Sequence, residues 1–216
     1  MAAAQGPAEW NARAGRNGSR RHGRQALPAS YGASVPLTPV FKASYTAGET
    51  NMLDLVLHPD EKLRVVSEPV KTVNGDIARL AGDMIATMQR EQGIGLAGVQ
   101  VGHLVRVFVT ALPDDKPRVF INPEVTATSE EVSKYEEGCL SFPGLYADVE
   151  RSTGCTVEAV DENGKPFRMD ADGMLARVIM HELDHLNGVL FVDYLSERKR
   201  NRLLKRYERL LAKARG

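Results

Sequence analysis

The stretch Val178–Gly188 constrains the fold more than any other part of the 216-residue chain. His181 and His185 are four residues apart, and on an α-helix such side chains lie about 40° apart around the axis, on one face. Asn187 and Gly188 supply a stop signal for this helix. Apolar residues surround the two histidines, so we expect the helix to be deeply buried: Leu175, Val178, Ile179, Leu183 and Leu186.

Glu182 completes a His-Glu-x-x-His pattern on this helix. In proteins with this pattern the two imidazoles bind one metal ion, and the glutamate acts as general base toward a water on that metal. Three fixed positions in five residues also occur by chance, and two histidines on a helix are often ordinary core or surface residues. The pattern therefore predicts a metal site only if a third ligand lies elsewhere.

Cys139 is the natural third ligand. A thiolate and two neutral imidazoles make three protein ligands and leave a fourth position open, which is the arrangement of a catalytic metal site. The remaining histidines, His22, His58 and His103, have no helpful context. Cysteine is more often a small buried apolar residue, but Cys139 lies in a charged, turn-rich segment where core packing explains it poorly.

The only two cysteines, Cys139 and Cys155, indicate a reducing compartment rather than a secreted disulfide scaffold. A disulfide between them stays open as an alternative, and it would exclude Cys139 as a ligand. No apolar run approaches the ~20 residues that cross a bilayer, so we expect no membrane partner.

A formal net charge of zero conceals an uneven distribution of charge. Residues 1–50 carry six basic and two acidic residues, and residues 196–216 carry nine basic and two acidic residues. Residues 51–195 carry 13 basic and 24 acidic residues. An acidic body therefore lies between two basic ends. Two interpretations of residues 196–216 stay open: a solvated helix surface, or contact with a polyanionic partner.

We expect residues 1–50 to be disordered, because Gly, Ala, Ser, Pro and Arg dominate and no period of 2 or 3.6 persists. An Arg-rich, acid-poor composition is typical of an organellar transit peptide. The alternative is a non-native extension upstream of a true start at Met52. The segment lacks the apolar core of a secretory signal.

Two further helices are expected. One begins at Asn74 or Asp76 and continues to about residue 91, with an apolar stripe of Ile77, Leu80, Ala81, Met84, Ile85 and Met88. The other follows Ser196, its N-cap, and is basic except for an apolar stripe of Leu203, Leu204, Tyr207, Leu210 and Leu211. Asp172 is expected to cap the helix that carries the histidines.

Strands are expected at residues 53–57, 105–110 and 119–121, and an acidic loop at residues 130–137. Residues 156–160 and 167–169 predict a hairpin, since Asn163-Gly164 favours a tight two-residue turn.

The segment Gly93–Gly102 is too rich in glycine for a helix interior. The letters Gly93-Ile-Gly-Leu-Ala-Gly98 fit a phosphate-binding loop, but they follow a helix and precede a strand, which is the wrong order. A plain turn and a loop whose backbone lies against a ligand remain as alternatives.

Three segments together resemble, in order and spacing, the signature motifs of peptide deformylases: Gly93-Ile-Gly-Leu-Ala-Gly-Val-Gln100, Glu137-Gly-Cys-Leu-Ser141 and His181-Glu-Leu-Asp-His185. The resemblance implies an α+β catalytic domain over residues 51–216, with mostly antiparallel strands around a central metal-binding helix. The amphipathic helix at 76–91 and the basic helix at 196–216 would pack outside it. The implied reaction is removal of the formyl group from N-terminal formyl-methionine, releasing formate.

The resemblance also implies a set of metal ligands, namely Cys139, His181 and His185. They would hold one divalent ion, expected to be Fe²⁺, although Zn²⁺ or Ni²⁺ suits the same donors. Glu182 would act as general base and then as general acid.

Binding roles follow from the same resemblance. The side-chain amide of Gln100 and the backbone N–H of Leu140 would stabilise the oxyanion. The backbone of Ile94 and Gly95 would pair with the extended peptide substrate, which explains the glycines better than a plain turn does.

The implied partners are formyl-methionyl nascent polypeptides and the ribosome, on which the basic helix 196–216 would dock. We expect a monomer in the bacterial cytoplasm, or in a plastid or mitochondrion if residues 1–50 are a transit peptide. A metallopeptidase shares the helix motif, but Cys139 argues against it. A non-catalytic RNA-binding factor would have no use for an open metal site.

Departures from the family pattern are expected to affect substrate preference more than reaction type. Gly98 stands where Ala is usual, Met180 where Gln is usual, and Tyr146 where relatives often carry a charge. Arg177 occupies a position that often lines the methionine pocket with an apolar side chain. Asp184 should point away from the metal and pair with Arg151.

Overall fold

An antiparallel sheet with helices on both faces forms the body of the computed structural model, which describes residues 51–113 and 115–214. The expectations for residues 1–50 lie outside the described residues. In chain order the elements are η1 (Glu61–Arg64), α1 (Gly75–Arg90), β1 (Gly95–Ala97), η2 (Gly98–Val101), β2 (Val107–Thr110), β3 (Arg118–Thr128), β4 (Val132–Gly138), β5 (Tyr146–Ser152), β6 (Gly154–Val160), β7 (Pro166–Asp172), α2 (Gly173–Leu186), η3 (Phe191–Tyr194) and α3 (Glu197–Ala214).

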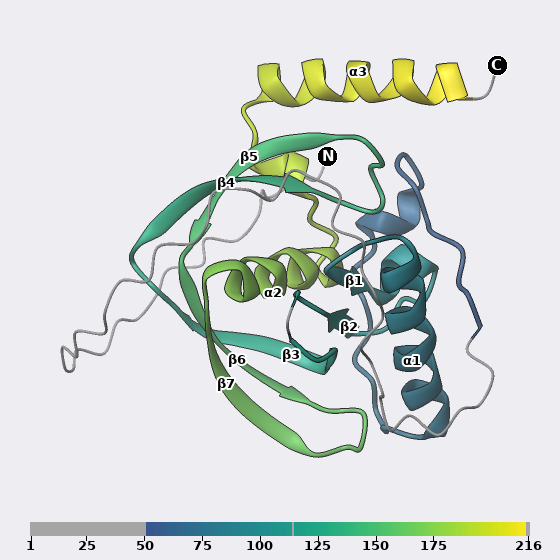
Figure 1. Ribbon diagram of the computed structural model, residues 1–216, viewed down its shortest axis with the longest axis vertical. Helices are drawn as coiled ribbons and strands as arrows, with labels where there is room; N and C mark the ends of the chain where they lie inside the picture. The colour runs from purple at the N-terminus through teal and green to yellow at the C-terminus, as the bar shows by residue number, and fades with distance from the viewer. Residues whose placement is uncertain (1–50, 114, 215–216) are drawn as a thin grey trace, which may run out of the picture. The chain divides into compact units, whose positions relative to one another are not determined.

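The strands form a five-stranded sheet in the order β1-β2-β3-β6-β7 and a separate two-stranded hairpin, β4-β5. Every pairing between these strands is antiparallel. Helix α2 lies between the five-stranded sheet and the β4-β5 hairpin (Figure 1). The predicted α+β architecture around a central helix is therefore confirmed.

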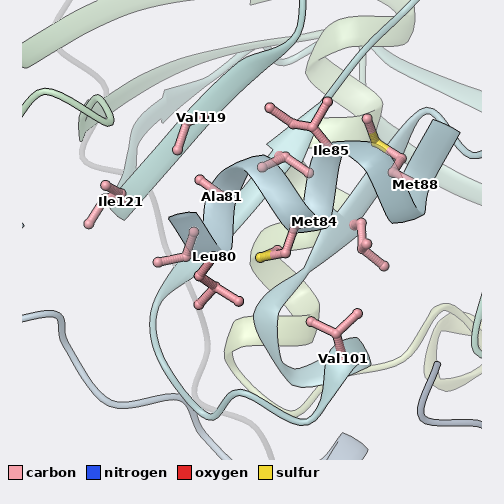
Figure 2. Close-up of a cluster of buried hydrophobic side chains, with 11 residues drawn as sticks. Leu80, Ala81, Met84, Ile85, Met88, Val101, Val119 and Ile121 are labelled. Atoms are coloured by element: carbon pink, nitrogen blue, oxygen red, sulfur yellow. The ribbon is translucent and has the colours of Figure 1, made fainter. Parts of the chain in front are cut away.

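Helix α1 begins where the sequence places it. The side chain of Asn74 accepts hydrogen bonds from the N–H groups of Asp76 and Ile77, each at 3.1 Å, and so satisfies two donors that the first turn leaves free. The predicted apolar stripe packs on β2 and β3 (Figure 2). Its fully or largely buried members are Leu80, Ala81, Met84, Ile85 and Met88.

Strand β2 and the segment Val119–Ile121 of β3 are buried on both faces. Val107 and Val109 of β2 belong to the apolar cluster under α1, whereas Phe108 between them belongs to the cluster under α2. A strand that is covered on both faces has a continuous run of apolar residues instead of alternating apolar and polar ones. This explains why residues 105–110 and 119–121 stand out in the sequence, although β3 continues to Thr128.

Helix α2 follows β7 without a connecting loop. Asp172 holds the predicted N-cap position, but its side chain makes no capping hydrogen bond. The N–H of Gly173 donates to Thr153 O at 2.8 Å, so the neighbouring backbone satisfies a donor of the first turn. At the other end Gly188 has φ +71°, and a Cβ there would lie 2.5 Å from Arg64 O, so the position requires glycine.

Two local predictions are wrong. Residues 53–57 form no strand; they run beside η2, and Val56 N–H donates to Gln100 O at 2.8 Å. The acidic segment 130–137 is no loop, because most of it belongs to β4, which pairs with β5. Only Glu137 among the residues of β4 is buried, so no apolar alternation marks this strand in the sequence.

The predicted hairpin at 156–169 is confirmed as β6-β7, but its loop is longer than a two-residue turn. The loop spans Asp161–Lys165, and the side chain of Asp161 accepts hydrogen bonds from Asn163 N–H and Lys165 N–H, each at 2.9 Å. These bonds stabilise a wider connection than Asn163-Gly164 alone would specify.

Helix α3 is attached to the body through Tyr207, which is 1% exposed. Its ring packs on Phe142, with ring centroids 5.5 Å apart, in an apolar cluster that includes Leu145 and Phe191. Cys139, which is partly buried, packs against this cluster. Among the described residues no helix has the length and apolar character needed to cross a membrane.

We predict that Met84→Ala lowers the free energy of unfolding by about 2–5 kcal/mol, because this fully buried side chain would leave a cavity. Arg79 is exposed on the same helix, so Arg79→Ala should change that free energy by less than about 0.5 kcal/mol. Urea unfolding followed by circular dichroism compares the two variants. Equal losses would contradict the packing of α1 through this face.

Candidate metal centre

The three predicted metal ligands come together from two elements. Helix α2 carries His181 and His185 on one face, and Cys139 follows directly after the last residue of β4. One donor atom from each residue lies within 4.8 Å of the other two. Within 51–113 and 115–214, no other group of three or more His, Cys, Asp or Glu residues converges in this way.

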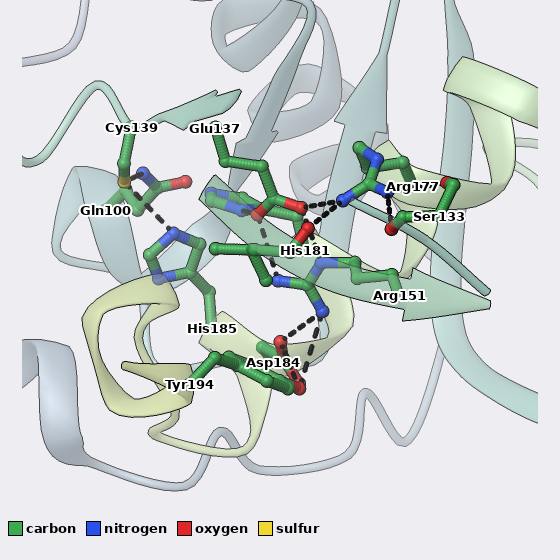
Figure 3. Close-up of polar contacts among 11 residues, drawn as sticks. Gln100, Ser133, Glu137, Cys139, Arg151, Arg177, His181, Asp184, His185 and Tyr194 are labelled. Atoms are coloured by element: carbon green, nitrogen blue, oxygen red, sulfur yellow. Dashed lines mark hydrogen bonds and ion pairs between the residues drawn. The ribbon is translucent and has the colours of Figure 1, made fainter. Parts of the chain in front are cut away.

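The contacts around the donors show which atoms face one another (Figure 3). Cys139 Sγ lies 3.2 Å from His185 Nε2, and the side-chain amide of Gln100 lies 3.4 Å from the same sulfur. His181 Nδ1 lies 2.9 Å from a carboxylate oxygen of Glu137. The remaining ring nitrogen of His181, Nε2, is therefore the one available to a metal ion.

The donor set fits a divalent metal ion. A thiolate and two imidazoles suit Zn²⁺, Fe²⁺ and Ni²⁺, and three protein ligands leave a position open. Beside them Glu182, only 4% exposed, has a buried oxygen, Oε2, without a hydrogen-bond partner in the described chain. Burying a carboxylate oxygen without a hydrogen-bond partner destabilises a protein. A polar ligand in the site would provide the missing partner for Oε2.

The two histidines have opposite electrostatic surroundings in the metal-free protein. Burial disfavours the charged form of His181, but hydrogen bonds with Cys139 and Glu137 outweigh burial and raise its pKa to about 10. Burial, followed by the charge of His181, holds the pKa of His185 well below its usual value. Metal binding must displace a proton from this cluster, so metal affinity should rise with pH.

Glu182 has the electrostatic surroundings of a general base. Burial raises the pKa of its carboxyl to about 7, although His181 and Arg151 act in the opposite direction. A base is most effective when its pKa lies near the working pH. A carboxyl group with a pKa in this range can accept and release a proton near neutral pH.

The buried carboxylate of Glu137 links α2 to the β4-β5 hairpin, a role that the spacing of residues in the sequence does not predict. Its Oε1 accepts from Arg151 Nε and Arg177 Nη1, each at 2.7 Å. Its Oε2 accepts from Arg151 Nη2 at 3.1 Å and faces His181. Burial alone would raise the pKa of Glu137, but the hydrogen bonds of His181 and Arg151 hold it at about 2.

The expected pair of Asp184 and Arg151 is confirmed. Arg151 Nη1 donates to Asp184 Oδ2 at 2.7 Å, and the hydroxyl of Tyr194 donates to the same oxygen at 2.9 Å. Asp184 is absent from the donor group, as predicted. Through Arg151 this pair is joined to Glu137 and so to His181.

Close backbone contacts bring the glycine-rich segment into the site. A Cβ at Gly93 would lie 2.7 Å from Leu140 Cδ1, and a Cβ at Gly95 would lie 2.3 Å from Glu182 Oε1. Neither glycine could be larger without displacing a side chain of another motif. The interpretation of this segment as a plain turn is therefore wrong, because β1 packs directly against the metal helix.

Strand β1 is an edge strand of the sheet. The N–H of Ala97 donates to Gln100 Oε1 at 2.8 Å on the open side of the strand, and the twofold period of a strand places the N–H of Gly95 on that side. The carbonyl of Ile94 faces β2 instead, where it accepts from Ala111 N–H at 3.0 Å. Gly95 is thus oriented toward the open edge and the Ile94 carbonyl is not.

Two alternatives from the sequence are excluded. Cys139 and Cys155 are both free thiols, so no disulfide removes Cys139 from the donor set. The phosphate-binding interpretation is also wrong, since a Cβ at Gly98 would meet three carbonyl oxygens, from His103, Val105 and Val107. Carbonyl oxygens repel a phosphate, and η2, which follows, has only four residues.

Comparison with known proteins gives a consistent result. The profile of one family, polypeptide deformylase, matches residues 52–201. A peptide deformylase of Rhizobium meliloti (strain 1021) is 51% identical over 166 residues, which are 75% of this chain and 95% of that protein. One of Azotobacter vinelandii is 49% identical over 73% of this chain and 95% of that protein.

Solved structures show the same likeness. The crystal structure of peptide deformylase from Ehrlichia chaffeensis has a TM-score of 0.72 at 38% identity, over 76% of this chain and 99% of that one. A peptide deformylase from Synechococcus elongatus in complex with actinonin has a TM-score of 0.69 at 42% identity. The match covers 71% of this chain and 86% of that one.

We predict that Gly95→Ala lowers the free energy of unfolding by about 1–3 kcal/mol, because the added Cβ would meet Glu182 and also Val178 Cγ1, at 2.8 Å. Gly75→Ala is the matched control, since a Cβ there meets nothing within 4 Å and should be neutral or slightly stabilising. Thermal unfolding compares the two. A Gly95→Ala variant as stable as the control would refute the close contact between β1 and α2.

Proposed function

The chain belongs to the polypeptide deformylase family, and on that premise we propose that Cys139, His181 and His185 hold the divalent metal ion on which its activity depends. That activity is hydrolytic removal of the formyl group from the N-terminal formyl-methionine of newly synthesised polypeptides, with release of formate. The observation that carries the ligand assignment is the convergence of the three donor atoms within 4.8 Å.

We propose Fe²⁺ as the physiological ion. The donors accept Fe²⁺, Zn²⁺ and Ni²⁺ alike, so support for iron comes from the family resemblance and not from the geometry. Metal analysis after anaerobic purification from cells supplied with iron tests the choice. About one iron per chain would support it, and zinc in iron's place under those conditions would contradict it.

Glu182 is proposed as the group that moves the protons. A divalent ion held by Cys139, His181 and His185 would lower the pKa of a water molecule and so activate it near neutral pH. Glu182 takes a proton from the attacking water and later delivers one to the leaving amine, so that the formyl C–N bond breaks to give formate and a free N-terminus. The raised pKa of Glu182 and its buried Oε2 support this role.

Gln100 and Leu140 are proposed to stabilise the negative charge that develops on the formyl oxygen. The side-chain amide of Gln100 is held in one orientation, because its Oε1 accepts from Ala97 N–H and its Nε2 faces Cys139 Sγ and Ser141 Oγ. Leu140 directly follows Cys139, so its backbone N–H lies next to the sulfur ligand in the chain.

The substrate peptide is proposed to add to the open edge of β1 as an extended strand. Main-chain hydrogen bonds would supply affinity for any sequence that follows the formyl-methionine. Gly95 is the better supported of the two predicted contacts, because its N–H lies on the open side of β1 whereas the Ile94 carbonyl bonds to Ala111.

We predict that Glu182→Gln keeps its metal but loses about 10²–10⁴ in kcat, because the amide cannot accept the proton. Cys139→Ala should lose both metal and activity, since one of three ligands is gone. The assay is formate release from formyl-Met-Ala-Ser by anaerobically purified, iron-supplemented protein, with metal content measured on the same sample.

Cys155→Ala is the control for Cys139→Ala, because Cys155 is a buried thiol in the core under α2 and should leave metal and turnover unchanged. Full activity of Glu182→Gln would refute the proton-transfer role. The same peptide without its formyl group tests the metallopeptidase alternative, which requires cleavage of peptide bonds without formate.

The basic face of α3 is proposed to dock on ribosomal RNA. Six of its residues line a shallow surface hollow, and five of them carry a positive charge: Arg198, Asn201, Arg202, Lys205, Arg206 and Arg209. Positive side chains on one helix face fit a phosphate backbone, and such binding weakens steeply with salt. Tyr207 anchors the same helix to the body, so charges can be changed without removing the helix.

We predict that Arg202→Glu with Arg209→Glu weakens ribosome binding at least tenfold at low salt and reduces its salt dependence, while kcat/KM for formyl-Met-Ala-Ser is unchanged. Lys71→Glu with Arg79→Glu, two exposed cations outside α3, is the matched control and should bind normally. Co-sedimentation with ribosomes over a range of salt measures both. Equal binding by the two double variants would refute docking through α3.

We further propose that residues 51–216 form one catalytic domain, that the protein is a monomer, and that it works in the bacterial cytoplasm. Light scattering measures the molar mass in solution, which should equal that of one chain, 23.7 kDa. Import of the full chain into isolated plastids or mitochondria, with cleavage near residue 50, would instead support the transit-peptide interpretation.

A further inference from the structure

Arg177 lies one helical turn before His181, on the face of α2 that carries the metal ligands. It is 5% exposed, which is unusual for an arginine unless its charge is paired. The ring of Tyr135 lies over the guanidinium, with the carbon Cζ 5.7 Å from the ring centre. The position is therefore closed off from solvent, and the sequence-based expectation that Arg177 alters a substrate pocket finds no support in these contacts.

Four hydrogen bonds engage the guanidinium. Nη1 donates to Glu137 Oε1 at 2.7 Å and to Val149 O at 3.1 Å. Nη2 donates to the carbonyl of Ser133 at 2.7 Å and to its hydroxyl at 2.9 Å. Both terminal nitrogens of Arg177 are thus fully used within the protein, and none of these donors is left to bind a substrate.

These partners join the two elements that supply the metal ligands. Ser133 and Glu137 belong to β4, which ends immediately before Cys139, and Val149 belongs to the paired strand β5. Arg177 itself belongs to α2, as do His181 and His185. One side chain therefore fixes the strand that leads to the sulfur ligand against the helix that carries the nitrogen ligands.

The Glu137 carboxylate has a defined orientation only because donors approach it from two sides. Arg151, from β5, bonds to both of its oxygens, while Arg177 holds Oε1 from the helix side. Oε2 is then directed at His181 Nδ1. Figure 3 shows the carboxylate between the two arginines. Without Arg177, α2 would contact this carboxylate only through His181 itself and, indirectly, through the bond of Asp184 to Arg151. Oε1 would lose its donor from α2, so the orientation of Oε2 toward His181 would be less firmly fixed.

We propose that Arg177 is a positioning residue for the metal centre: it holds Glu137 on His181 and sets the separation between Cys139 and the two histidine ligands. The proposal rests on the metal site proposed above. Partners of this kind orient a histidine ligand and typically change metal affinity or activity by about 10–100-fold when they are lost. Arg177 acts only through Glu137 and the backbone and side chains of the β4-β5 hairpin, and it touches no reacting group.

Zinc release tests the proposal with a readout other than turnover. Full-length protein is loaded with Zn²⁺, and transfer of the ion to an excess of a coloured chelator gives its dissociation rate. We expect Arg177→Met to release zinc about 10–100-fold faster than the wild type, because an apolar side chain of similar length removes the donor that Arg177 supplies to Glu137 Oε1. Arg177→Lys restores one donor and should lie between the two.

Arg168→Met is the matched control, since Arg168 is an exposed arginine paired with Glu158 on the sheet and should leave the release rate unchanged. If Arg177→Met does not fold, Arg177→Lys carries the test, together with the visible absorption spectrum of the Co²⁺-loaded protein. A changed Co²⁺ spectrum is expected, since the geometry of the donors should change.

Different results would contradict the positioning role of Arg177 and the assignment of the metal ligands. Release rates and Co²⁺ spectra equal to the wild type in folded Arg177 variants would overturn the positioning role, even if their unfolding free energy fell. Zinc held as tightly by Cys139→Ala as by the wild type would overturn the ligand assignment on which the proposal rests.

Discussion

The structure depends on one buried carboxylate, that of Glu137. A carboxylate removed from water is strongly destabilising unless charged or polar donors surround it, and three surround this one: Arg151, Arg177 and His181. The donors come from β5 and α2, while Glu137 itself comes from β4. Satisfying this one charge therefore requires that the hairpin and α2 meet in a single arrangement. That arrangement brings Cys139 close to His181 and His185, the other two proposed ligands.

Close backbone approaches at two glycines also shape the site. Gly93, two residues before β1, allows the backbone to approach Leu140, and Gly95 allows β1 to approach Glu182. Glu182, the proposed general base, thus lies against the backbone of an edge strand and is almost fully buried. Burial in this region also raises the pKa of Glu182 to about 7, so the packing around this carboxyl favours its protonated form.

The sequence predicts those features whose cause is local. Spacing along one helix identifies His181, Glu182 and His185, and the apolar period of α1 marks its buried face. The sequence does not predict β4, because its burial comes from one charged residue, Glu137, instead of alternating apolar ones. It also misses the partnership of Glu137 and Arg177, which are 40 residues apart. A charged residue inside the apolar stripe of α2 was the available signal, since a buried arginine requires a partner.

The most direct test of the metal centre is X-ray absorption spectroscopy of the zinc-loaded protein, which identifies the atoms bound to the ion. We predict one sulfur at about 2.3 Å and two imidazole nitrogens at about 2.0–2.1 Å, from Cys139, His181 and His185. Cys139→Ala should bind little zinc, and any zinc that it retains should show no sulfur ligand. A wild-type spectrum without sulfur, or a sulfur that persists in that variant, would contradict the arrangement on which the proposed mechanism depends.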